Sequence, residues 1–161
     1  MQRKRKNLYW VILSLLVVLG DQVAKYYVMH HLVLGEPRSV LPVLNMMLAY
    51  NKGTAFSLLS QGAHWQYYFL TGVAIAVSAM VLVWLIQLPY HQRWAACALS
   101  LILGGAIGNV WDRFLYGYVI DFIDFHIQHW HFATFNIADA AITVGAIMLI
   151  GEMLLSNVSS A

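Results

Sequence analysis

Residues 67–88 read YYFLTGVAIAVSAMVLVWLIQL and contain no charged side chain. A run of about 20 apolar residues is long enough, as a helix, to cross a hydrocarbon core of roughly 30 Å. Pro89 follows directly, and because proline has no backbone N–H it ends the helix. This stretch therefore predicts a transmembrane helix and decides the class of fold.

Three further apolar runs accompany this one, and the four predicted spans cover residues 8–28, 67–88, 94–112 and 137–155. Hydrophobic residues make up 61% of the 161 residues and charged residues only 10%, whereas a soluble domain usually carries about 25% charged residues. Helices are expected because lipid cannot satisfy free backbone N–H and C=O groups. We predict one integral-membrane domain over residues 1–161, an all-α membrane protein with four transmembrane helices.

Basic residues predict the orientation of these spans. The cluster RKRK at residues 3–6 precedes the first span and favours a cytoplasmic N-terminus. Alternation then places residues 29–66 and 113–136 outside, residues 89–93 inside, and the C-terminus in the cytoplasm. The first span resembles a signal peptide, but no small-x-small cleavage site follows it and the run continues to Val28. We therefore expect it to be retained.

The composition also excludes several classes of protein. A net charge of +2 is too small to indicate a nucleic-acid partner. Cys97 is the single cysteine, so there is no intramolecular disulfide and no cysteine-rich metal site. No G-x-S-x-G turn and no phosphate-binding glycine loop is present.

The two loops predicted to lie outside have distinct compositions. Residues 40–56 place apolar side chains among the turn formers Pro42, Asn51 and Gly53, which favours short strands at the membrane surface. Residues 113–136 contain several aromatic side chains of the kind that favour the membrane interface. We expect the first loop to form short strands at the membrane surface.

Polar residues converge on the same side of the membrane. Charged side chains inside a span cost roughly 2.5–3.5 kcal/mol each on insertion scales, yet this chain keeps several. The charged and amide side chains predicted near the outer surface are Asp21, Lys25, Asn109, Asp112, Arg113, Asp121, Asp124, Asn136 and Asp139. Glu152 is the main exception, near the inner end of the last span. This convergence is the strongest functional signal in the pattern.

Spacing relates some of these residues in pairs. Asp21 and Lys25 stand four residues apart on one helix face, either as a self-neutralising pair or as a brace for a site. Asn109 and Arg113 have the same spacing and could anchor the helix or hold a peptide carbonyl. The glycines at 104 and 108 have the spacing that lets another helix approach closely.

Asn136 and Asp139 have two interpretations. Asn-x-x-Asp at a helix start is typical of an N-cap with an acid at the third position. Alternatively, Asp139 could share a site with a second carboxylate, so that one proton is held between them and water is activated, as in aspartic proteases. Spacing alone does not choose Asp121 over Asp112 or Asp124 as that partner.

Histidines suggest a different kind of site. His126, His129 and His131 form H-x2-H-x-H, which could hold a metal, but the spacing matches no helical HExxH site and interfacial histidines are the favoured explanation. Two other hypotheses thus stay open at this point. One is a metal-dependent membrane hydrolase; the other is a small transporter with Asp21, Lys25 and Arg113 along a polar path.

Five motifs in order resemble those of the lipoprotein signal peptidase family, also called signal peptidase II. They are Asp21-x-x-x-Lys25, Asn51-Lys-Gly53-Thr-Ala55-Phe56, Gly104-Gly-Ala-Ile-Gly108-Asn109-Val-Trp-Asp112-Arg113, Val119-Ile-Asp121-Phe122 and Phe135-Asn136-Ile-Ala138-Asp139. The resemblance covers nearly the whole chain. It implies a bacterial aspartic endopeptidase of the cytoplasmic membrane, with a small extracytoplasmic β-cradle added to the four helices. We expect no cofactor or metal, and a monomer.

The resemblance also implies a substrate and roles for individual residues. The substrate would be a prolipoprotein whose cysteine carries diacylglyceryl, held in membrane lipid and cut on the N-terminal side of that cysteine. Asp121 and Asp139 correspond to the catalytic pair. Asn51, Asn109, Arg113 and Asn136 fall at substrate-holding positions. Asp21, Lys25, Gly53, Asp112 and Ala138 fall at supporting positions.

Overall fold

The computed structural model describes residues 9–53, 65–128 and 130–158. Within these ranges the chain forms four long helices, each with a stretch long and apolar enough to cross a membrane. They are α1 (Trp10–His31), α2 (Trp65–Gln87), α3 (Arg93–Tyr116) and α4 (Ile137–Val158). The predicted class of four transmembrane helices is confirmed, although α1 ends at His31 rather than Val28 and α3 at Tyr116 rather than Asp112.

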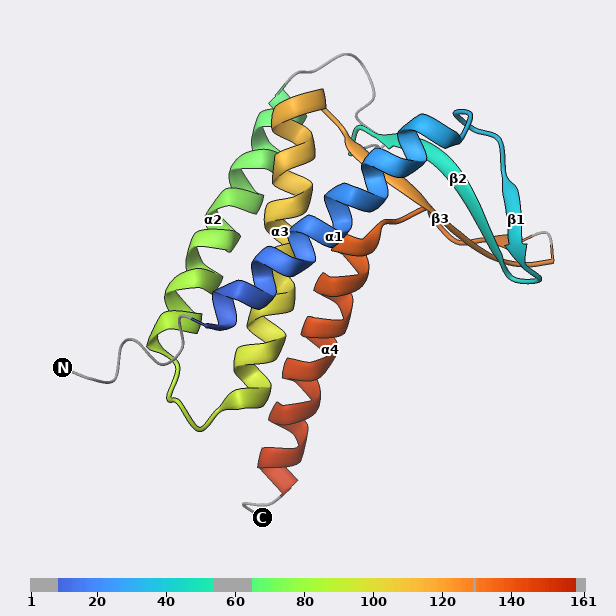
Figure 1. Cartoon of the computed structure of the whole chain (residues 1–161). Helices are drawn as coiled ribbons and strands as arrows, with labels where there is room; N and C mark the ends of the chain where they lie inside the picture. The colour runs from blue at the N-terminus through green and yellow to red at the C-terminus, as the bar shows by residue number, and fades with distance from the viewer. Residues whose placement is uncertain (1–8, 54–64, 129, 159–161) are drawn as a thin grey trace.

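α3 is the central helix, and α1, α2 and α4 each pack against it (Figure 1). Small residues allow this close packing. A Cβ atom on Gly104 would lie 2.7 Å from the backbone oxygen of Ser14 in α1, and one on Gly108 would lie 2.9 Å from the carboxylate of Asp21. The predicted approach of a second helix to the two glycines is therefore confirmed, and α1 is that helix.

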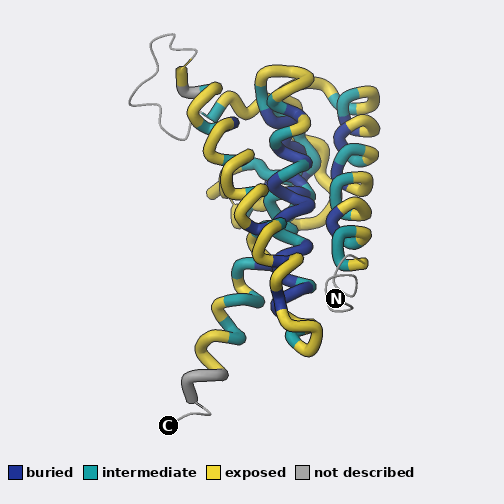
Figure 2. Tube along the Cα trace, turned by 90° about the vertical axis from the view of Figure 1, so that its left-hand side faces the viewer, coloured by how far each residue is buried: buried dark blue, intermediate teal, exposed yellow. Residues whose placement is uncertain are grey.

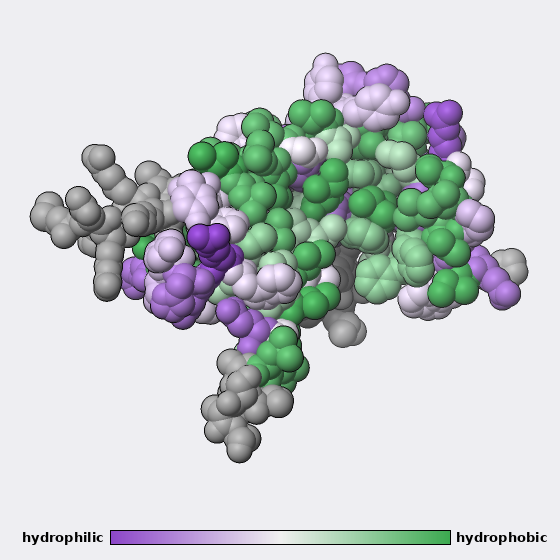
Figure 3. Space-filling model, turned by 60° about the horizontal axis from the view of Figure 1, so that its bottom comes forward, coloured by the Kyte–Doolittle hydropathy of each residue, from purple (hydrophilic) through white to green (hydrophobic). Residues whose placement is uncertain are grey.

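The outward faces of the helices are apolar. Buried residues concentrate along α3, while much of α1, α2 and α4 is exposed (Figure 2). Leu15, Met80 and Ile147 are 55%, 65% and 63% exposed. Hydrophobic side chains also dominate the surface seen in Figure 3, with hydrophilic side chains in separate patches. An apolar surface this large suits lipid rather than water.

An antiparallel sheet extends from one end of the bundle (Figure 1). Its strands lie in the order β1 (Arg38–Leu41), β2 (Leu44–Asn51), β3 (Val119–Ile127) and β4 (Trp130–His131). Strands were expected in residues 40–56, and β1 and β2 fulfil this; residues 54–56 lie outside the described ranges. β3 was not predicted, although VIDFIDFHI is rich in the β-branched and aromatic residues that favour strands.

Two features hold the sheet against the helices. Gly117 adopts a left-handed φ of 79° after α3, and its N–H donates to the carbonyl of Arg113, so the chain turns sharply into β3. An apolar cluster of Val28, Leu48 and Ile120 then joins α1 to β2 and β3. We call the end of the helix bundle that contacts the sheet the sheet end. The opposite end, where α1 begins and α4 ends, is the far end.

Candidate active site

A buried polar cluster occupies the sheet end, where α1, α3, α4 and β3 meet. Buried charges are costly unless they are paired and hydrogen-bonded. The buried members are Asp21, Lys25, Asn109, Asp112, Asp121 and Asn136, each at most 7% exposed. All six belong to the set that the sequence predicted to converge.

Lys25 lies between two carboxylates. Its Nζ atom is 2.7 Å from Oδ2 of Asp21 in the same helix and 2.7 Å from Oδ2 of Asp112 in α3. The predicted i,i+4 pair is thus part of a three-member ionic cluster. Gln22 also donates to Oδ1 of Asp112, at 2.8 Å. Gln22 was not among the predicted polar residues, although an amide side chain within an apolar span was a signal for it.

The same carboxylates hold the backbone of neighbouring elements. Oδ2 of Asp112 accepts a hydrogen bond from the N–H of Ile120 in β3, at 3.0 Å. Oδ1 of Asp21 accepts one from the N–H of Ala138 in the first turn of α4, at 2.9 Å. Ala138 is fully buried, so a larger side chain has no space there. The ionic cluster therefore ties the starts of β3 and α4 to the helix bundle.

Asp121 is buried in β3 and faces two amide donors. Its Oδ2 accepts from Nδ2 of Asn51 at 3.0 Å, and its Oδ1 accepts from Nδ2 of Asn136 at 2.8 Å. Burial raises the pKa of Asp121 to about 7; the charge of Asp139 adds to this rise, and the two amide donors offset part of it. Asp121 therefore gains and loses its proton near neutral pH rather than in the acidic range usual for a carboxyl group.

Asn51 is oriented by the turn that follows β2. The N–H of Gly53 donates to Oδ1 of Asn51 at 2.8 Å, which leaves the amide nitrogen free to meet Asp121. Gly53 has a φ of 81°, and a Cβ atom there would meet the side chain of Leu70. The backbone conformation therefore favours glycine, and a larger residue would also require the Leu70 side chain to shift. The rest of this motif, residues 54–56, lies outside the described ranges.

Asp139 stands in the first turn of α4 and is half-buried. Its N–H donates to Oδ1 of Asn136 at 2.8 Å, and its Oδ2 accepts from the N–H of Asn136 at 3.2 Å. This reciprocal pair is the helix cap that the sequence predicted. Asn136 also donates to Asp121, so the side chain that caps α4 contacts a second carboxylate as well.

Asn109 connects this pair to the ionic cluster. Its Oδ1 accepts from Nζ of Lys25 at 3.3 Å and from Nδ2 of Asn136 at 3.1 Å, and its Nδ2 donates to Oδ1 of Asp139 at 2.7 Å. A cation on one side and a carboxylate on the other fix which way the amide points. Asp121 and Asp139 thus belong to one network held by two asparagines.

Arg113 lies half-buried at the end of α3. Its Nη1 donates to the carbonyl oxygen of Asn109 at 3.2 Å, so this part of the guanidinium binds its own helix. Tyr67 of α2 donates its hydroxyl to the carbonyl oxygen of Arg113 at 2.8 Å. Tyr67 is a second residue that sequence reasoning missed, because its partner lies 46 positions away.

Asp124 is separated from this network. It lies three residues after Asp121 in β3, and residues at odd spacing in a strand point to opposite faces. Asn45 donates to its Oδ2 at 2.9 Å, and Nδ1 of His131 lies 2.9 Å from its Oδ1. Burial alone would raise the pKa of Asp124, but these two partners outweigh it and the pKa falls below its usual range. Geometry therefore distinguishes two aspartates that spacing did not.

The geometry also bears on the hypotheses of a histidine metal site and of a transport path. His126 stacks on His131, and His129 lies outside the described residues. Across the parts of the chain that the structure describes, no three His, Cys, Asp or Glu side chains are grouped to hold a metal. Asp21 and Lys25, suggested for a transport path, are engaged in the ionic cluster.

Comparisons with known proteins identify similar chains. The family model described as signal peptidase (SPase) II matches residues 13–155. The chain is 47% identical over 155 residues to the lipoprotein signal peptidase of Coxiella burnetii (strain Dugway 5J108-111), covering 96% of this chain and 95% of that relative. It is 46% identical to that of Yersinia enterocolitica over 150 residues, with 93% and 89% covered.

Two solved structures have the same fold. One is a bacterial membrane enzyme determined by the in meso method at 1.9 Å resolution, with a TM-score of 0.83, 33% identity, and 96% of this chain and 97% of that chain covered. The other, determined by the same method at 2.3 Å, has a TM-score of 0.84 and 31% identity, with 100% and 96% covered.

Proposed function

Because the chain belongs to the signal peptidase II family, which removes signal peptides from prolipoproteins, we propose that Asp121 and Asp139 are its catalytic pair. The observation that carries this proposal is the position of Asn136, which donates to Asp121 and reciprocally caps Asp139. Aspartic peptidases need two carboxylates in one site, of which one is protonated and one ionised.

The surroundings of the two residues suggest how they divide the work. Asp121 is buried and holds the proton, because burial raises its pKa to about 7. Asp139 is half-buried, so water can reach it. In the first step the water oxygen attacks the peptide carbonyl carbon, Asp139 takes a proton from that water, and Asp121 donates its proton to the carbonyl oxygen.

The second step restores the pair. Asp139 passes the proton it has taken to the departing amine nitrogen as the C–N bond breaks, and Asp121 recovers a proton from the hydroxyl of the tetrahedral intermediate. The products are a carboxylic acid and an amine, and no covalent intermediate with the enzyme forms. The asparagines fix the carboxylates so that little reorganisation is needed in the transition state.

The remaining polar residues are assigned by their contacts. Asn51, Asn109 and Asn136 orient the carboxylates through their amide groups, and their motif positions assign them to holding the substrate. Arg113 keeps further N–H donors beyond its bond to the carbonyl of Asn109, and these suit peptide carbonyl oxygens. The supporting residues are Asp21, Lys25, Gly53, Asp112 and Ala138, which hold the elements that carry this site.

The location of the site in the fold suits a lipid-anchored substrate. A cysteine that carries diacylglyceryl is held at headgroup depth by its acyl chains, and the proposed pair lies at the end of the bundle, beside the sheet. We propose that the sheet end faces the outside of the bacterial cytoplasmic membrane, that both termini are cytoplasmic, and that the protein acts as a monomer. The basic residues 3–6 support this orientation.

A cleavage assay tests the proposal. The purified protein in detergent receives a prolipoprotein with a diacylglyceryl-modified cysteine, with EDTA present, and a gel shift reports release of the signal peptide. Wild type is expected to cleave, and Asp139→Asn to lose about 1,000-fold or more in rate. Near-normal cleavage by a folded Asp139→Asn protein would refute the pair, and dependence on added zinc would favour metal catalysis.

A further inference from the structure

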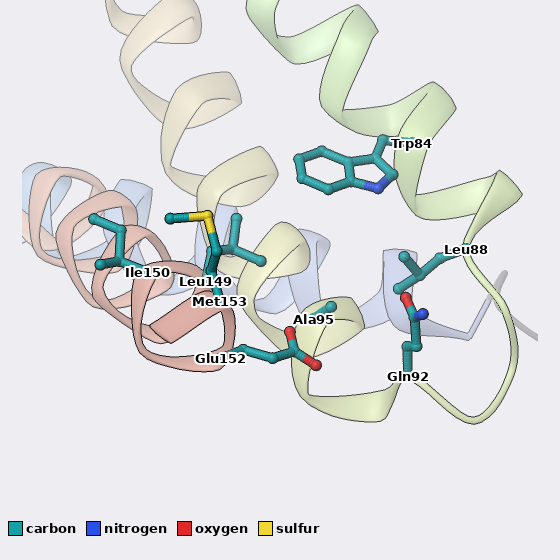
Figure 4. Close-up of a pocket in the computed structure, with 8 residues that line it drawn as sticks. All are labelled: Trp84, Leu88, Gln92, Ala95, Leu149, Ile150, Glu152 and Met153. Carbon is teal, nitrogen blue, oxygen red and sulfur yellow. The ribbon is translucent and has the colours of Figure 1, made fainter. Parts of the chain in front are cut away.

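A cavity of about 450 Å³ lies at the far end of the bundle, away from the proposed active site (Figure 4). Trp84 and Leu88 line it from the end of α2, Leu149 and Ile150 from α4, and Ala95 from α3. Most of its wall is apolar. It is the size of a site for a few side chains rather than for a single water molecule.

One carboxylate interrupts this apolar wall. Glu152 is half-buried in α4, and Figure 4 shows its carboxylate in the space between α4 and Gln92. In the described parts of the chain, no cation lies within ion-pair distance of Glu152, and no hydrogen-bond donor meets it. It falls within the stretch Ile137–Leu155, which is apolar enough to cross a membrane, where an unpaired charge is costly.

The position of Glu152 is unusual among the acidic residues of the chain. The chain has seven acidic residues, and the other six belong to the sheet end or the segments beside it: Asp21, Glu36, Asp112, Asp121, Asp124 and Asp139. Glu152 therefore presents the one negative side chain at the far end among the described residues. A ligand that uses it must bring a positive charge.

α4 connects the proposed active site to this cavity. Asp139 is in its first turn and Glu152 is thirteen positions later, which corresponds to about 20 Å along a helix axis. The two sites are therefore about one short helical segment apart along α4.

The dimensions and charges match those of a signal peptide. Such peptides begin with a basic segment, continue with an apolar segment of about 7–15 residues, and end at the cleavage site. As a helix the apolar segment spans roughly 10–22 Å. When the scissile bond lies at Asp139, the basic segment is then level with Glu152.

We propose that the far-end cavity, with Glu152 as its charged group, binds the basic N-terminal segment of the prolipoprotein signal peptide. The proposal rests on the function proposed above and adds a second point of recognition. Trp84 and Leu88 contact the aliphatic stem of a lysine or arginine, and Glu152 pairs with its head. The site favours precursors with a basic N-terminal segment over neutral ones.

Enzyme kinetics with matched precursors test this. One diacylglyceryl-modified precursor carries two lysines before its apolar segment, and a second carries serines there. With the basic precursor, Glu152→Gln is expected to raise KM about five-fold and to leave kcat within two-fold. With the neutral precursor, Glu152→Gln and wild type have the same KM. Glu36→Gln, the same chemical change on an exposed loop at the sheet end, leaves both KM values unchanged.

Photocrosslinking tests the site independently of catalysis. Benzoylphenylalanine replaces Trp84 in an Asp139→Asn background, so that the precursor stays uncleaved. Crosslinks to the basic segment that weaken with Glu152→Gln support the proposal, whereas cleavage of the precursor in the Asp139→Asn background would show that the catalytic pair is misassigned and leaves the crosslinks to report on this site. Crosslinks only to residues 1–8 of this chain would overturn the proposal. It would also be overturned if KM were the same for the basic and the neutral precursor and did not change with Glu152→Gln.

Discussion

Nδ2 of Asn136 lies 2.8 Å from Oδ1 of Asp121, while Oδ1 of the same asparagine accepts the backbone N–H of Asp139. One buried side chain thus sets the position of one aspartate and the helix start that carries the other. Because Asn136 is completely buried, its amide has no water to replace these partners. The geometry of the proposed catalytic pair therefore depends on it.

Asn136→Ala is expected to lower kcat by about 100-fold, because Asp121 loses a donor and the start of α4 loses its cap. The measurement is the cleavage rate at saturating precursor. Asn45→Ala is the matched control, since Asn45 donates to Asp124 instead. We expect its kcat to stay within about three-fold of wild type. Equal losses for the two variants would show that the effect is one of general stability.

The activity should fall as the pH rises above neutrality. Asp121 must be protonated to donate, and burial raises its pKa to about 7. The enzyme with protonated Asp121 therefore predominates below this pH and is lost above it. The rate constant kcat/KM should therefore decline about ten-fold per pH unit at alkaline pH. A profile that stays flat between pH 6 and pH 9 would contradict this assignment of the proton.

Asn51→Ala should move this alkaline limb to higher pH. The bond from Asn51 favours the ionised form of Asp121 and lowers its pKa, so removal of the donor raises the pKa further. The readout is the midpoint of the limb rather than the absolute rate, which also falls. A shift to lower pH, or none, would show that Asn51 does not act on the group that limits the rate.

Lys25→Met should destabilise the protein strongly. It leaves Asp21 and Asp112 buried side by side without their cation, and loss of one partner from a buried ion pair costs about 3–5 kcal/mol. Thermal unfolding in detergent measures the loss. Lys52→Met removes an exposed lysine and should have little effect. Similar melting temperatures for both variants would mean that the ionic cluster does not support the fold.

Gly53→Ala should lower kcat/KM by about ten-fold, because the added Cβ atom meets the side chain of Leu70 and displaces Asn51. Gly35→Ala separates this effect from backbone strain. Gly35 has a similar φ of 77°, but a Cβ atom there meets nothing within 4 Å. We expect Gly35→Ala to cost some stability and to leave the activity nearly unchanged. Equal loss of activity would implicate strain alone.

The sequence predicted those parts of the fold that depend on local pattern. Uninterrupted apolar runs give the four helices, because only a helix satisfies its own backbone within lipid. The Asn136–Asp139 cap and the Asp21–Lys25 pair follow from spacings of three and four residues along one helix. Each of these interactions lies within one segment, so no knowledge of the tertiary structure is needed.

The rest depends on contacts between distant segments. Asn51 meets Asp121 across 70 positions, and Asp112 joins Lys25 from another helix. β3 was not predicted because its partner β2 lies far away in the sequence, and without β3 the opposite faces of Asp121 and Asp124 cannot be assigned. Only the ordered motifs of the family indicated Asp121 from the sequence.

The relative cleavage rates of Asp121→Asn and Asp124→Asn test the central claim most directly. Both residues are 1% exposed carboxyl groups of one strand, and both substitutions replace the carboxyl group by an amide of nearly equal size. In the gel-shift assay with a diacylglyceryl-modified precursor, Asp121→Asn should lose about 1,000-fold or more, while Asp124→Asn should stay within about ten-fold of wild type. Substantial cleavage by a folded Asp121→Asn protein, or equal loss in both variants, would contradict the proposed pair.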